Sequence, residues 1–179
     1  MKYTLEGQET ERLQFRLLKI EDFESWIQLF EDIEVCRFLG VDKIETPNER
    51  CRLWFELTFD RYENNLGGQN ILIEKKSNKI IGQSGLLVRQ IDGKKEIEIA
   101  YSILPNFRRK GFATESTEMC KNFAFENKFA ESLISIIHTE NTSSEKVAQK
   151  NGMKKEKITE YQGMQVNIFR INLNDWKTV

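Results

Sequence analysis

The sequence predicts one α/β domain of the α+β kind, in which about four helices flank a mixed, mostly antiparallel sheet of about seven strands. Three β-rich runs follow one another directly between residues 69 and 104, which indicates an antiparallel meander. Helical periodicity precedes this meander and returns after it. Residues 132–138, SLISIIH, are almost wholly apolar, as is typical of a strand buried on both faces. We therefore expect a single domain over residues 1–179, with its core at about 12–173.

The composition is that of a globular chain with one core, since 39% of the 179 residues are hydrophobic and 31% are charged. The formal net charge of −1 argues against nucleic acid or a membrane as partner. Cys36, Cys51 and Cys120 are odd in number and widely spaced, and His138 is the only histidine, so neither disulfides nor a metal site is predicted. The N-terminus has no apolar run of signal-peptide length, so we expect a cytoplasmic protein with reduced thiols.

The first half of the chain contains one predicted strand and two predicted helices. Residues 12–18, RLQFRLL, alternate in polarity and predict the strand. Residues 21–32 carry apolar side chains at helical spacing and predict the first helix. Residues 46–49, TPNE, form a capping box with proline at the first helical position, which predicts a second helix to about Asn64. The apolar residues that this helix is expected to bury are Leu53, Trp54, Leu57 and Phe59.

The second half adds two helices and the rest of the sheet. A helix is expected over about 109–127, and another over 141–150 that Asn151-Gly152 ends. The meander runs are separated by Ser-Asn and by Ile-Asp-Gly, which are turn sequences. The predicted strands are residues 69–76, 79–90, 95–104, 132–138, 154–161 and 164–173.

Three cations directly precede a glycine at a predicted helix start, in the stretch NFRRKGFATE over residues 106–115. The first amides of a helix lack internal partners and carry partial positive charge, so they attract anions. Gly111 lets the backbone approach a ligand closely, while Arg108, Arg109 and Lys110 add positive charge. The turn therefore either holds a phosphate group or is an ordinary helix start with solvated basic residues. Neither a P-loop nor a Rossmann glycine motif is present.

Together with the order of elements, three short motifs are similar to those of the GNAT superfamily of acyl-CoA-dependent N-acyltransferases. Residues 108–113, RRKGFA, fit that family's [RQ]-x-x-G-x-[GA] motif. Residues 141–144 fit N-x-x-S, and residues 150–153 fit K-x-G-[FM]. Over about residues 12–173, the chain most resembles the branch that contains the ribosomal-protein N-terminal acetyltransferases (RimJ/RimL-like). The resemblance implies a GNAT fold whose sheet is splayed between its fourth and fifth strands.

The same resemblance implies acetyl-CoA (coenzyme A) as co-substrate, with no metal. It places the pyrophosphate on the backbone amides of residues 109–114, and the pantetheine arm along residues 99–103, where the splay leaves backbone groups free. It places Asn141 on the other side of the arm. The residues implied to bind the coenzyme are Ile99, Ala100, Tyr101, Ser102, Ile103, Arg108, Arg109, Lys110, Gly111, Phe112, Ala113, Thr114, Asn141 and Ser144.

Acetyl transfer to an amine requires a base, because amines are mostly protonated at pH 7. Glu98 is the candidate base, since the family often places a carboxylate just before the position of Ala100. Glu96, Glu98 and Ala100 share one face of an alternating strand, so Glu96 is a candidate for attracting a cationic amine. The alternative is that both carboxylates line a solvated face or an edge of the sheet.

The group that protonates the leaving thiolate is not evident from the sequence. Many family members carry a tyrosine seven residues after the asparagine, where this chain has Ala148. As the resemblance implies, Ser144 or Asn141 is then the candidate for hydrogen-bonding the sulfur, although Ser144 also fits an exposed first-turn serine. Tyr101 and Tyr161 are reserve candidates for this role.

The remaining candidates are assigned to the acceptor side of the site. Phe38 and Trp54 fall in the helical segment that lines this side in the family, and core packing is the alternative for both. His138 ends the buried strand and is expected near the acceptor rather than in the chemistry. The acidic run over residues 31–34 either draws in a cationic acceptor or is a solvated face.

These expectations define a cytoplasmic acetyl-CoA-dependent N-acetyltransferase that transfers the acetyl group directly within a ternary complex. The first expected acceptor is a protein or peptide N-terminus, and the second is a small amine such as a polyamine, an amino sugar or an antibiotic. A non-catalytic acyl-CoA-binding module and a plain interaction domain are the rival interpretations. The sequence does not choose between a monomer and a homodimer.

Overall fold

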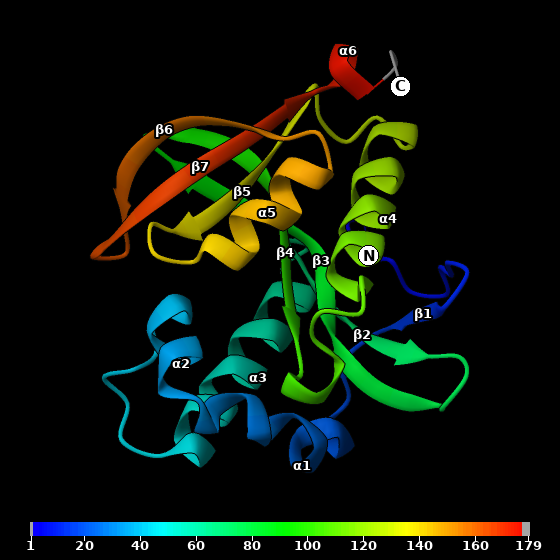
Figure 1. The fold of residues 1–179 in the computed structure, drawn as a ribbon, viewed down its shortest axis with the longest axis vertical. Coiled ribbons are helices and arrows are strands. Elements are labelled where there is room, and N and C mark those ends of the chain that lie inside the picture. The colour runs from blue at the N-terminus through cyan, green and yellow to red at the C-terminus, as the bar shows by residue number, and fades with distance from the viewer. Residues whose placement is uncertain (1, 177–179) are drawn as a thin grey trace.

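The computed structural model describes residues 2–176 and has the predicted α+β class (Figure 1). One sheet contains seven strands in the order β1-β2-β3-β4-β5-β7-β6. Neighbouring strands are antiparallel except β4 and β5, which are parallel, so the sheet is mixed and mostly antiparallel as predicted. The strands are β1 (Leu13–Arg16), β2 (Gly67–Glu74), β3 (Lys79–Ile91), β4 (Lys94–Ile103), β5 (Ser132–His138), β6 (Lys154–Tyr161) and β7 (Met164–Asn172).

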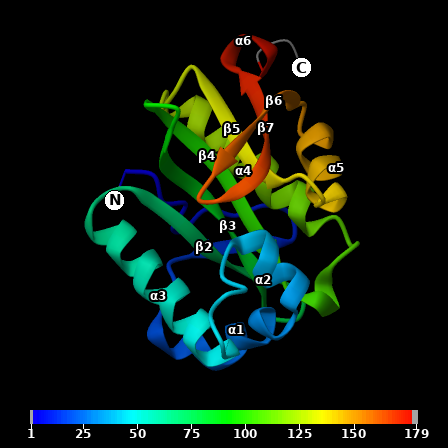
Figure 2. The same ribbon diagram turned by 90° about the vertical axis from the view of Figure 1, so that its left-hand side faces the viewer.

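The helices cover both faces of this sheet, and α3 and α5 lie on opposite sides of it (Figure 2). Within residues 2–176, no helix is both long enough and apolar enough to cross a membrane. The α-helices are α1 (Phe23–Trp26), α2 (Ile33–Leu39), α3 (Pro47–Glu63), α4 (Phe112–Glu126), α5 (Thr142–Lys150) and α6 (Leu173–Trp176). Short 3-10 segments are η1 (Ile20–Asp22), η2 (Ile27–Glu31) and η3 (Pro105–Phe107).

The start of α3 confirms the predicted capping box. Thr46 Oγ1 accepts a hydrogen bond from Glu49 N (3.2 Å), and Thr46 N donates to Glu49 Oε2 (3.2 Å), with Pro47 at the first helical position. The predicted buried face is wrong in part, because Leu57 is 50% exposed whereas Phe55 is 2% exposed. The helix is turned so that the Tyr62 hydroxyl donates to Gln69 O in β2, which directs Phe55 and Tyr62 toward the sheet.

The predicted helix over residues 21–32 is wrong as one continuous element, because the chain forms η1, α1 and η2 there. Asp32 has extended backbone angles (φ −83°, ψ 103°) and separates η2 from α2. Its carboxylate caps α2 by accepting from Glu34 N (3.1 Å) and Val35 N (3.4 Å). The acidic run thus provides a helix cap, which is the usual role of aspartate at this position. Trp26 and Phe30 are still fully buried in the core formed with α3.

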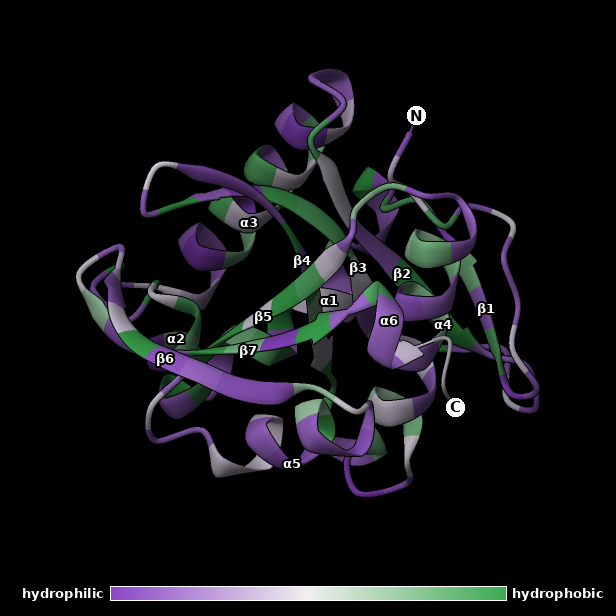
Figure 3. Cartoon of the chain, turned by 90° about the horizontal axis from the view of Figure 1, so that it is seen from above, coloured by the Kyte–Doolittle hydropathy of each residue, from purple (hydrophilic) through white to green (hydrophobic). Residues whose placement is uncertain are grey.

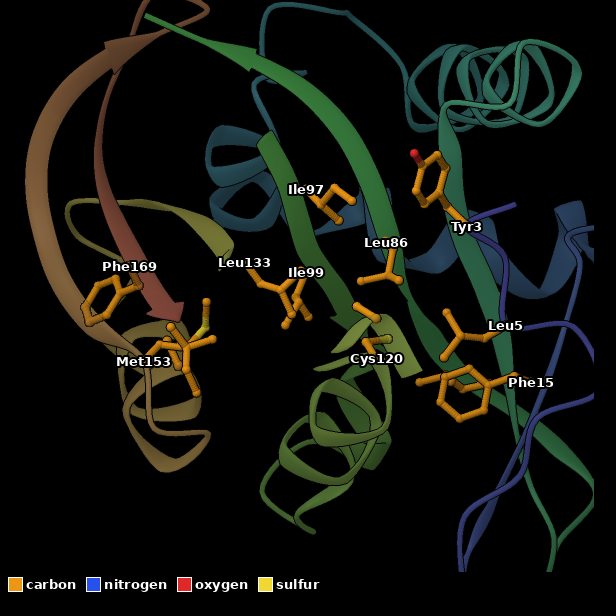
Figure 4. Packing of buried hydrophobic residues seen from close by; sticks show 14 of the residues in the cluster. Tyr3, Leu5, Phe15, Leu86, Ile97, Ile99, Cys120, Leu133, Met153 and Phe169 are labelled. Carbon is orange, nitrogen blue, oxygen red and sulfur yellow. The ribbon is translucent and has the colours of Figure 1, made fainter. Parts of the chain in front are cut away.

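The main hydrophobic core lies between the sheet and the helices α4 and α5 (Figure 4). Ile97 and Ile99 of β4 and Leu133 of β5 point into it, together with Cys120 of α4. Because side chains alternate along a strand, Glu96, Glu98 and Ala100 of β4 face the opposite side of the sheet, toward α2 and α3. This alternation places Glu98 on the face that α4 and α5 leave open.

The edge strand β6 is predominantly hydrophilic along its length (Figure 3). Lys154, Lys155 and Lys157 are exposed there, and a register shift between Lys155 and Lys157 interrupts the pairing with β7. Charges and a bulge of this kind protect a sheet edge from pairing with other strands. The β6–β7 hairpin is closed by Gln162 and Gly163, both with positive φ, as the predicted turn requires.

Candidate active site

The strands β4 and β5 separate soon after they meet. Among residues 2–176 they pair at one point only, Glu98 opposite Ile134, and Ser135 Oγ then donates to Ile99 O (2.9 Å). β4 continues to pair with β3 as far as Ile103. Because successive residues of a strand direct their backbone groups to opposite edges, Tyr101 turns its amide and carbonyl into the same opening as Ile99. The opening therefore offers an unpaired strand edge to an extended ligand that contains amides.

The start of α4 lies beside this opening and lacks a side-chain cap, whereas α2, α3 and α5 each have one. Gly111 is the N-cap in the left-handed conformation (φ 85°), and the amides of Phe112, Ala113 and Thr114 are the helix's unpaired donors. This left-handed residue also explains why α4 begins three residues after the predicted start. Arg109 has a positive φ as well (61°), and such strained residues collect at functional sites.

The three cations of the turn are exposed, but two of them contact other parts of the protein. Arg108 Nε donates to Ile103 O (3.1 Å), and its Nη1 lies 3.5 Å from Asp32 Oδ2. Lys110 Nζ lies 5.1 Å from the centre of the Phe107 ring. Arg108 therefore ties the end of β4 to the start of α2, in addition to any role toward an anion.

The N-terminal segment contacts the glycine turn and holds it in place. The sequence did not predict this contact. Glu115, in the first turn of α4, accepts from Thr10 Oγ1 (2.5 Å), Arg12 N (3.0 Å) and Arg12 Nε (2.6 Å). Arg12 Nη1 also donates to Lys110 O (3.0 Å), and its guanidinium lies 4.5 Å from the centre of the Phe112 ring. Although burial opposes the shift, the hydrogen bonds from Thr10 and Arg12 lower the pKa of Glu115. Arg12 is thus a positioning residue for this turn.

Asn141 and Ser144 lie together at the start of α5, on the opposite side of the opening from β4. Asn141 Oδ1 accepts from Ser144 N (3.0 Å), which caps the helix and leaves the amide hydrogens of Asn141 for another partner. The Tyr101 hydroxyl donates to Ser144 O (3.3 Å), so β4 reaches α5 here. Burial raises the pKa of Tyr101 to about 12, so the phenol keeps its proton at neutral pH. The second reserve candidate, Tyr161, lies instead on the other side of the sheet with Ile134 and Ile168, where the centre of its ring is 5.9 Å from the guanidinium carbon of Arg89.

The two candidate carboxylates of β4 have separate guanidinium partners. Glu98 is 6% exposed, and its Oε2 accepts from Arg89 Nε (2.7 Å). Glu96 forms a bidentate pair with Arg170, at 3.0 and 2.9 Å. Glu98 therefore does not line a solvated face, and Glu96 is committed to Arg170 rather than directed at an incoming amine. Spacing along the strand did not reveal either arginine partner.

The aromatic acceptor-side candidates divide into two places. The rings of Phe38 and His138 have their centres 5.2 Å apart, where α2 meets the end of β5. His138 Nδ1 accepts from Glu140 N (3.2 Å), so this nitrogen has a structural role. Trp54 lies apart from them on α3, where its indole Nε1 donates to Gln83 Oε1 (3.0 Å). The structure thus brings Phe38 and His138 together, and leaves Trp54 in the wall formed by α3.

The splayed strands and the uncapped helix start define a class of protein, the acyltransferases that use coenzyme A. Residues 12–154 match the family model for the acetyltransferase (GNAT) domain. The chain belongs to this GNAT family and is an N-acetyltransferase. It is 26% identical over 151 residues to the uncharacterized N-acetyltransferase YoaA of Bacillus subtilis (strain 168), which is 84% of each chain.

Solved structures share the fold at low sequence identity. An acetyltransferase from Agrobacterium tumefaciens C58 has a TM-score of 0.78 at 19% identity, with 96% and 97% of the two chains covered. RimL, a ribosomal α-N-protein acetyltransferase in complex with coenzyme A, has a TM-score of 0.76 at 15% identity, with 94% and 98% covered. A spermidine N-acetyltransferase from Vibrio cholerae in complex with coenzyme A and spermine has a TM-score of 0.73 at 16% identity, with 94% and 99% covered. The neighbours therefore include protein and polyamine acetyltransferases.

Proposed function

We propose that this protein acetylates the N-terminal amine of a peptide or protein, by direct transfer from acetyl-CoA within a ternary complex. The observation that carries the proposal is the position of Glu98. It stands where β4 and β5 part, and it faces the side of the sheet that α4 and α5 do not cover. A carboxylate there would receive an amine that approaches from the side of α2 and α3.

The residues around the opening fit the coenzyme that the family uses. The unpaired amides of Phe112, Ala113 and Thr114, with Gly111 before them, would hold the pyrophosphate. The backbone of Tyr101 and the side-chain amide of Asn141 would hold the pantetheine arm from its two sides. When bound, acetyl-CoA supplies an activated acetyl thioester.

Glu98 would receive the proton that the acceptor ammonium must lose, through an intervening water. Arg89 holds one carboxylate oxygen, Oε2, and so fixes the orientation of the group. At the other end of the opening, the Ser144 hydroxyl would hydrogen-bond the coenzyme sulfur. The Tyr101 phenol lies next to Ser144 and remains protonated, and it would become a second donor there by turning its O–H from Ser144 O toward the sulfur.

The role of Glu98 is tested by Glu98→Gln, with Glu96→Gln as the matched control on the same strand and face. Glutamine still accepts the hydrogen bond from Arg89 but cannot take up a proton. We expect Glu98→Gln to lower kcat by 10²-fold or more, the range of general-base catalysis, while the Kd for acetyl-CoA changes less than threefold. Glu96→Gln is expected to keep kcat within about threefold. Unchanged kcat in Glu98→Gln would remove Glu98 as the base.

The acceptor class is tested by coenzyme A release with acetyl-CoA and a panel of acceptors. The panel contains short peptides with Ser, Ala or Met N-termini, spermidine, an aminoglycoside and a control without acceptor. We expect release above the control with peptides. Release with spermidine or the aminoglycoside alone would replace the peptide by a small amine as the substrate.

A further inference from the structure

Two arginine side chains, Arg89 and Arg61, lie near Glu98 on the face of the sheet toward α2 and α3, called the acceptor face below. Arg89 of β3 donates to it through Nε alone (2.7 Å), so Glu98 does not engage the two Nη groups of Arg89. An arginine uses both Nη groups, or one with Nε, to bind a carboxylate in the bidentate mode. Arg89 is partly exposed, its guanidinium carbon lies 5.9 Å from the centre of the Tyr161 ring, and it also forms a side-chain hydrogen bond with Tyr161.

Arg61 reaches the same part of the sheet from the end of α3, where it lies next to Arg89. Its Nη2 donates to Leu66 O (2.9 Å) and Val88 O (2.7 Å), which are neutral partners. Its Nε is buried and has no hydrogen-bond partner among residues 2–176. Burial, and then repulsion by Arg89, lower the pKa of Arg61 to about 10. The Arg61 cation is therefore held in an unfavourable place without an anion of its own.

The neighbouring charges do not supply this anion. Arg170, further along the same face, binds Glu96 in the bidentate mode and Glu156 at 2.9 Å. Asp60, which adjoins Arg61 in sequence, is exposed and accepts from Asn64 Nδ2 (3.0 Å). Arg61 and Arg89 thus face one carboxylate, and this part of the acceptor face has an excess of positive charge.

We infer that the acceptor carries a carboxylate near its amine, so that the substrate class is a peptide N-terminus with an acidic first or second residue. This inference rests on the function proposed above. The opening begins at Ala100. Ala100 and Glu98 are two residues apart, so their Cα atoms are separated by about 7 Å along the strand. An acidic side chain within the first two residues spans that distance from the amine, and its carboxylate would pair with the Nη groups of Arg89 and with Arg61.

The same charges disfavour a polyamine as acceptor. A protonated polyamine offers only cations and N–H donors, so it cannot pair with either arginine and is repelled by both. A peptide with lysine at the second position would meet the same repulsion. The charge of the second residue is therefore the variable that distinguishes the acceptors.

The test measures binding rather than turnover. Three peptides that begin with Ser and differ only in their second residue, which is Glu, Gln or Lys, are titrated calorimetrically into the enzyme saturated with coenzyme A. Spermidine is titrated separately in the same way. We expect the Glu peptide to bind about tenfold more tightly than the Gln peptide, and the Lys peptide and spermidine to bind most weakly. Arg61→Gln should reduce the Glu-to-Gln ratio to about threefold or less. Arg61→Lys should restore it, and Arg52→Gln, an exposed arginine on the same helix, should leave it unchanged.

Equal binding of the Glu and Gln peptides would overturn the inference, as would tighter binding of spermidine or the absence of binding by all three peptides. A preference that survives Arg61→Gln would also overturn the assigned site. Turnover with acetyl-CoA is measured separately on the same peptides. Tight, charge-dependent binding without turnover would count against the proposed function and not against the acidic acceptor.

Discussion

At the scale of single residues, the three cysteines are enclosed rather than poised for chemistry. Cys36, Cys51 and Cys120 are free and buried in the described structure. Burial raises the pKa of Cys51 and of Cys120 to about 12, so neither forms a thiolate at the pH of an ordinary assay. The thiolate is the reactive form of cysteine, so these groups are protected both by their surroundings and by their protonation.

We predict that the folded enzyme reacts slowly with a disulfide-exchange thiol reagent at pH 8. The expected result is less than one equivalent modified within the minutes of an activity assay, and all three thiols modified in denaturant. Absorbance with the native and the unfolded protein measures this directly. Rapid modification of the native protein would show that a thiol-bearing segment opens, and the same reagent would then give a false background for coenzyme A release.

The sequence motifs and the structure agree where the relevant contacts are local. Gly111 and Asn141 stand at the helix starts where their motifs place them, because a cap depends on neighbouring residues only. The partners Arg12 and Glu115 are 103 residues apart, and only the packing of the N-terminal segment on α4 brings them together. Arg89 reaches Glu98 through the register of β3 with β4, which spacing within one strand does not reveal.

At the scale of elements, the start of α4 depends on the tie between Glu115 and the N-terminal segment. The pKa of Glu115 is lowered from its ordinary value of 4.5, so the folded state favours its charged form. Its contribution to stability is fully present above pH 4.5 and is lost as the pH falls through the lower, folded-state pKa. The acid limit of stability is therefore set in part at the glycine turn.

We predict that Glu115→Gln lowers the free energy of unfolding most at pH 6–7, and that its difference from the wild type shrinks below pH 4.5. Urea unfolding at pH 7, 5, 4 and 3 measures this difference. Glu118→Gln, an exposed change on the same helix, is the control and is expected to have little effect at any of these values. A difference that stays constant with pH would mean that the glutamine variant loses packing rather than charge.

The junction of α4 with α5 includes one buried side chain with several hydrogen bonds, besides the bond from Lys121 Nζ to Asn151 O (3.2 Å). Asn151, which ends α5, donates through Nδ2 to Thr117 Oγ1 (2.5 Å), Val147 O (3.2 Å) and Thr114 O (3.4 Å). Because α4 carries the glycine turn and α5 carries Asn141, this junction sets the distance between the two helix starts that we propose to bind the coenzyme. A buried amide of this kind is costly to replace.

We predict that Asn151→Ala destabilises the protein by about 1–3 kcal/mol and weakens acetyl-CoA binding at the same time. Asn127→Ala is the control, because Asn127 also ends a helix and also donates to a helix carbonyl (Phe123 O, 2.8 Å), but at an exposed position. Unfolding in urea and calorimetric titration of acetyl-CoA measure the two effects. Lost stability with unchanged affinity would show that the helices keep their spacing without this hydrogen-bond set.

Element boundaries followed from the sequence where capping chemistry was explicit, as at Thr46 and Glu49 before α3. They failed over residues 21–32, where helical spacing predicted one helix. There the burial of Trp26 and Phe30 against α3 outweighs helix continuity, and Asp32 uses its side chain to start α2 instead. Periodicity shows which residues seek the core, but not whether the backbone reaches the core in one helix or in several short turns.

At the scale of the whole molecule, the opening divides the sheet into two parts. β1 to β4 form one part and β5 to β7 the other; among residues 2–176 the two parts share one pair in the strand ladder, Glu98–Ile134, and side-chain contacts such as Ser135 to Ile99 O and Arg170 to Glu96. The helices α4 and α5 pack across both parts from one side. A ligand that adds to the edge of β4 while it contacts α4 and α5 joins these parts, so its binding stabilises the entire domain rather than one loop.

We predict that acetyl-CoA at about 100 times its Kd raises the midpoint of thermal unfolding by about 5–10 °C, since such saturation adds about 2.7 kcal/mol and each kcal/mol shifts a chain of this size by roughly 2–4 °C. Adenosine, which lacks the pyrophosphate and the arm, should give no comparable shift. Comparing Gly111→Ala with Gly93→Ala distinguishes a loss of coenzyme binding from a general effect of backbone strain. Both glycines have positive φ (85° and 75°), but Gly93 lies in the β3–β4 turn with open space around it. Both variants should unfold at lower temperature, and only Gly111→Ala should lose most of the shift. An equal shift in the two variants would show that the coenzyme does not use the start of α4.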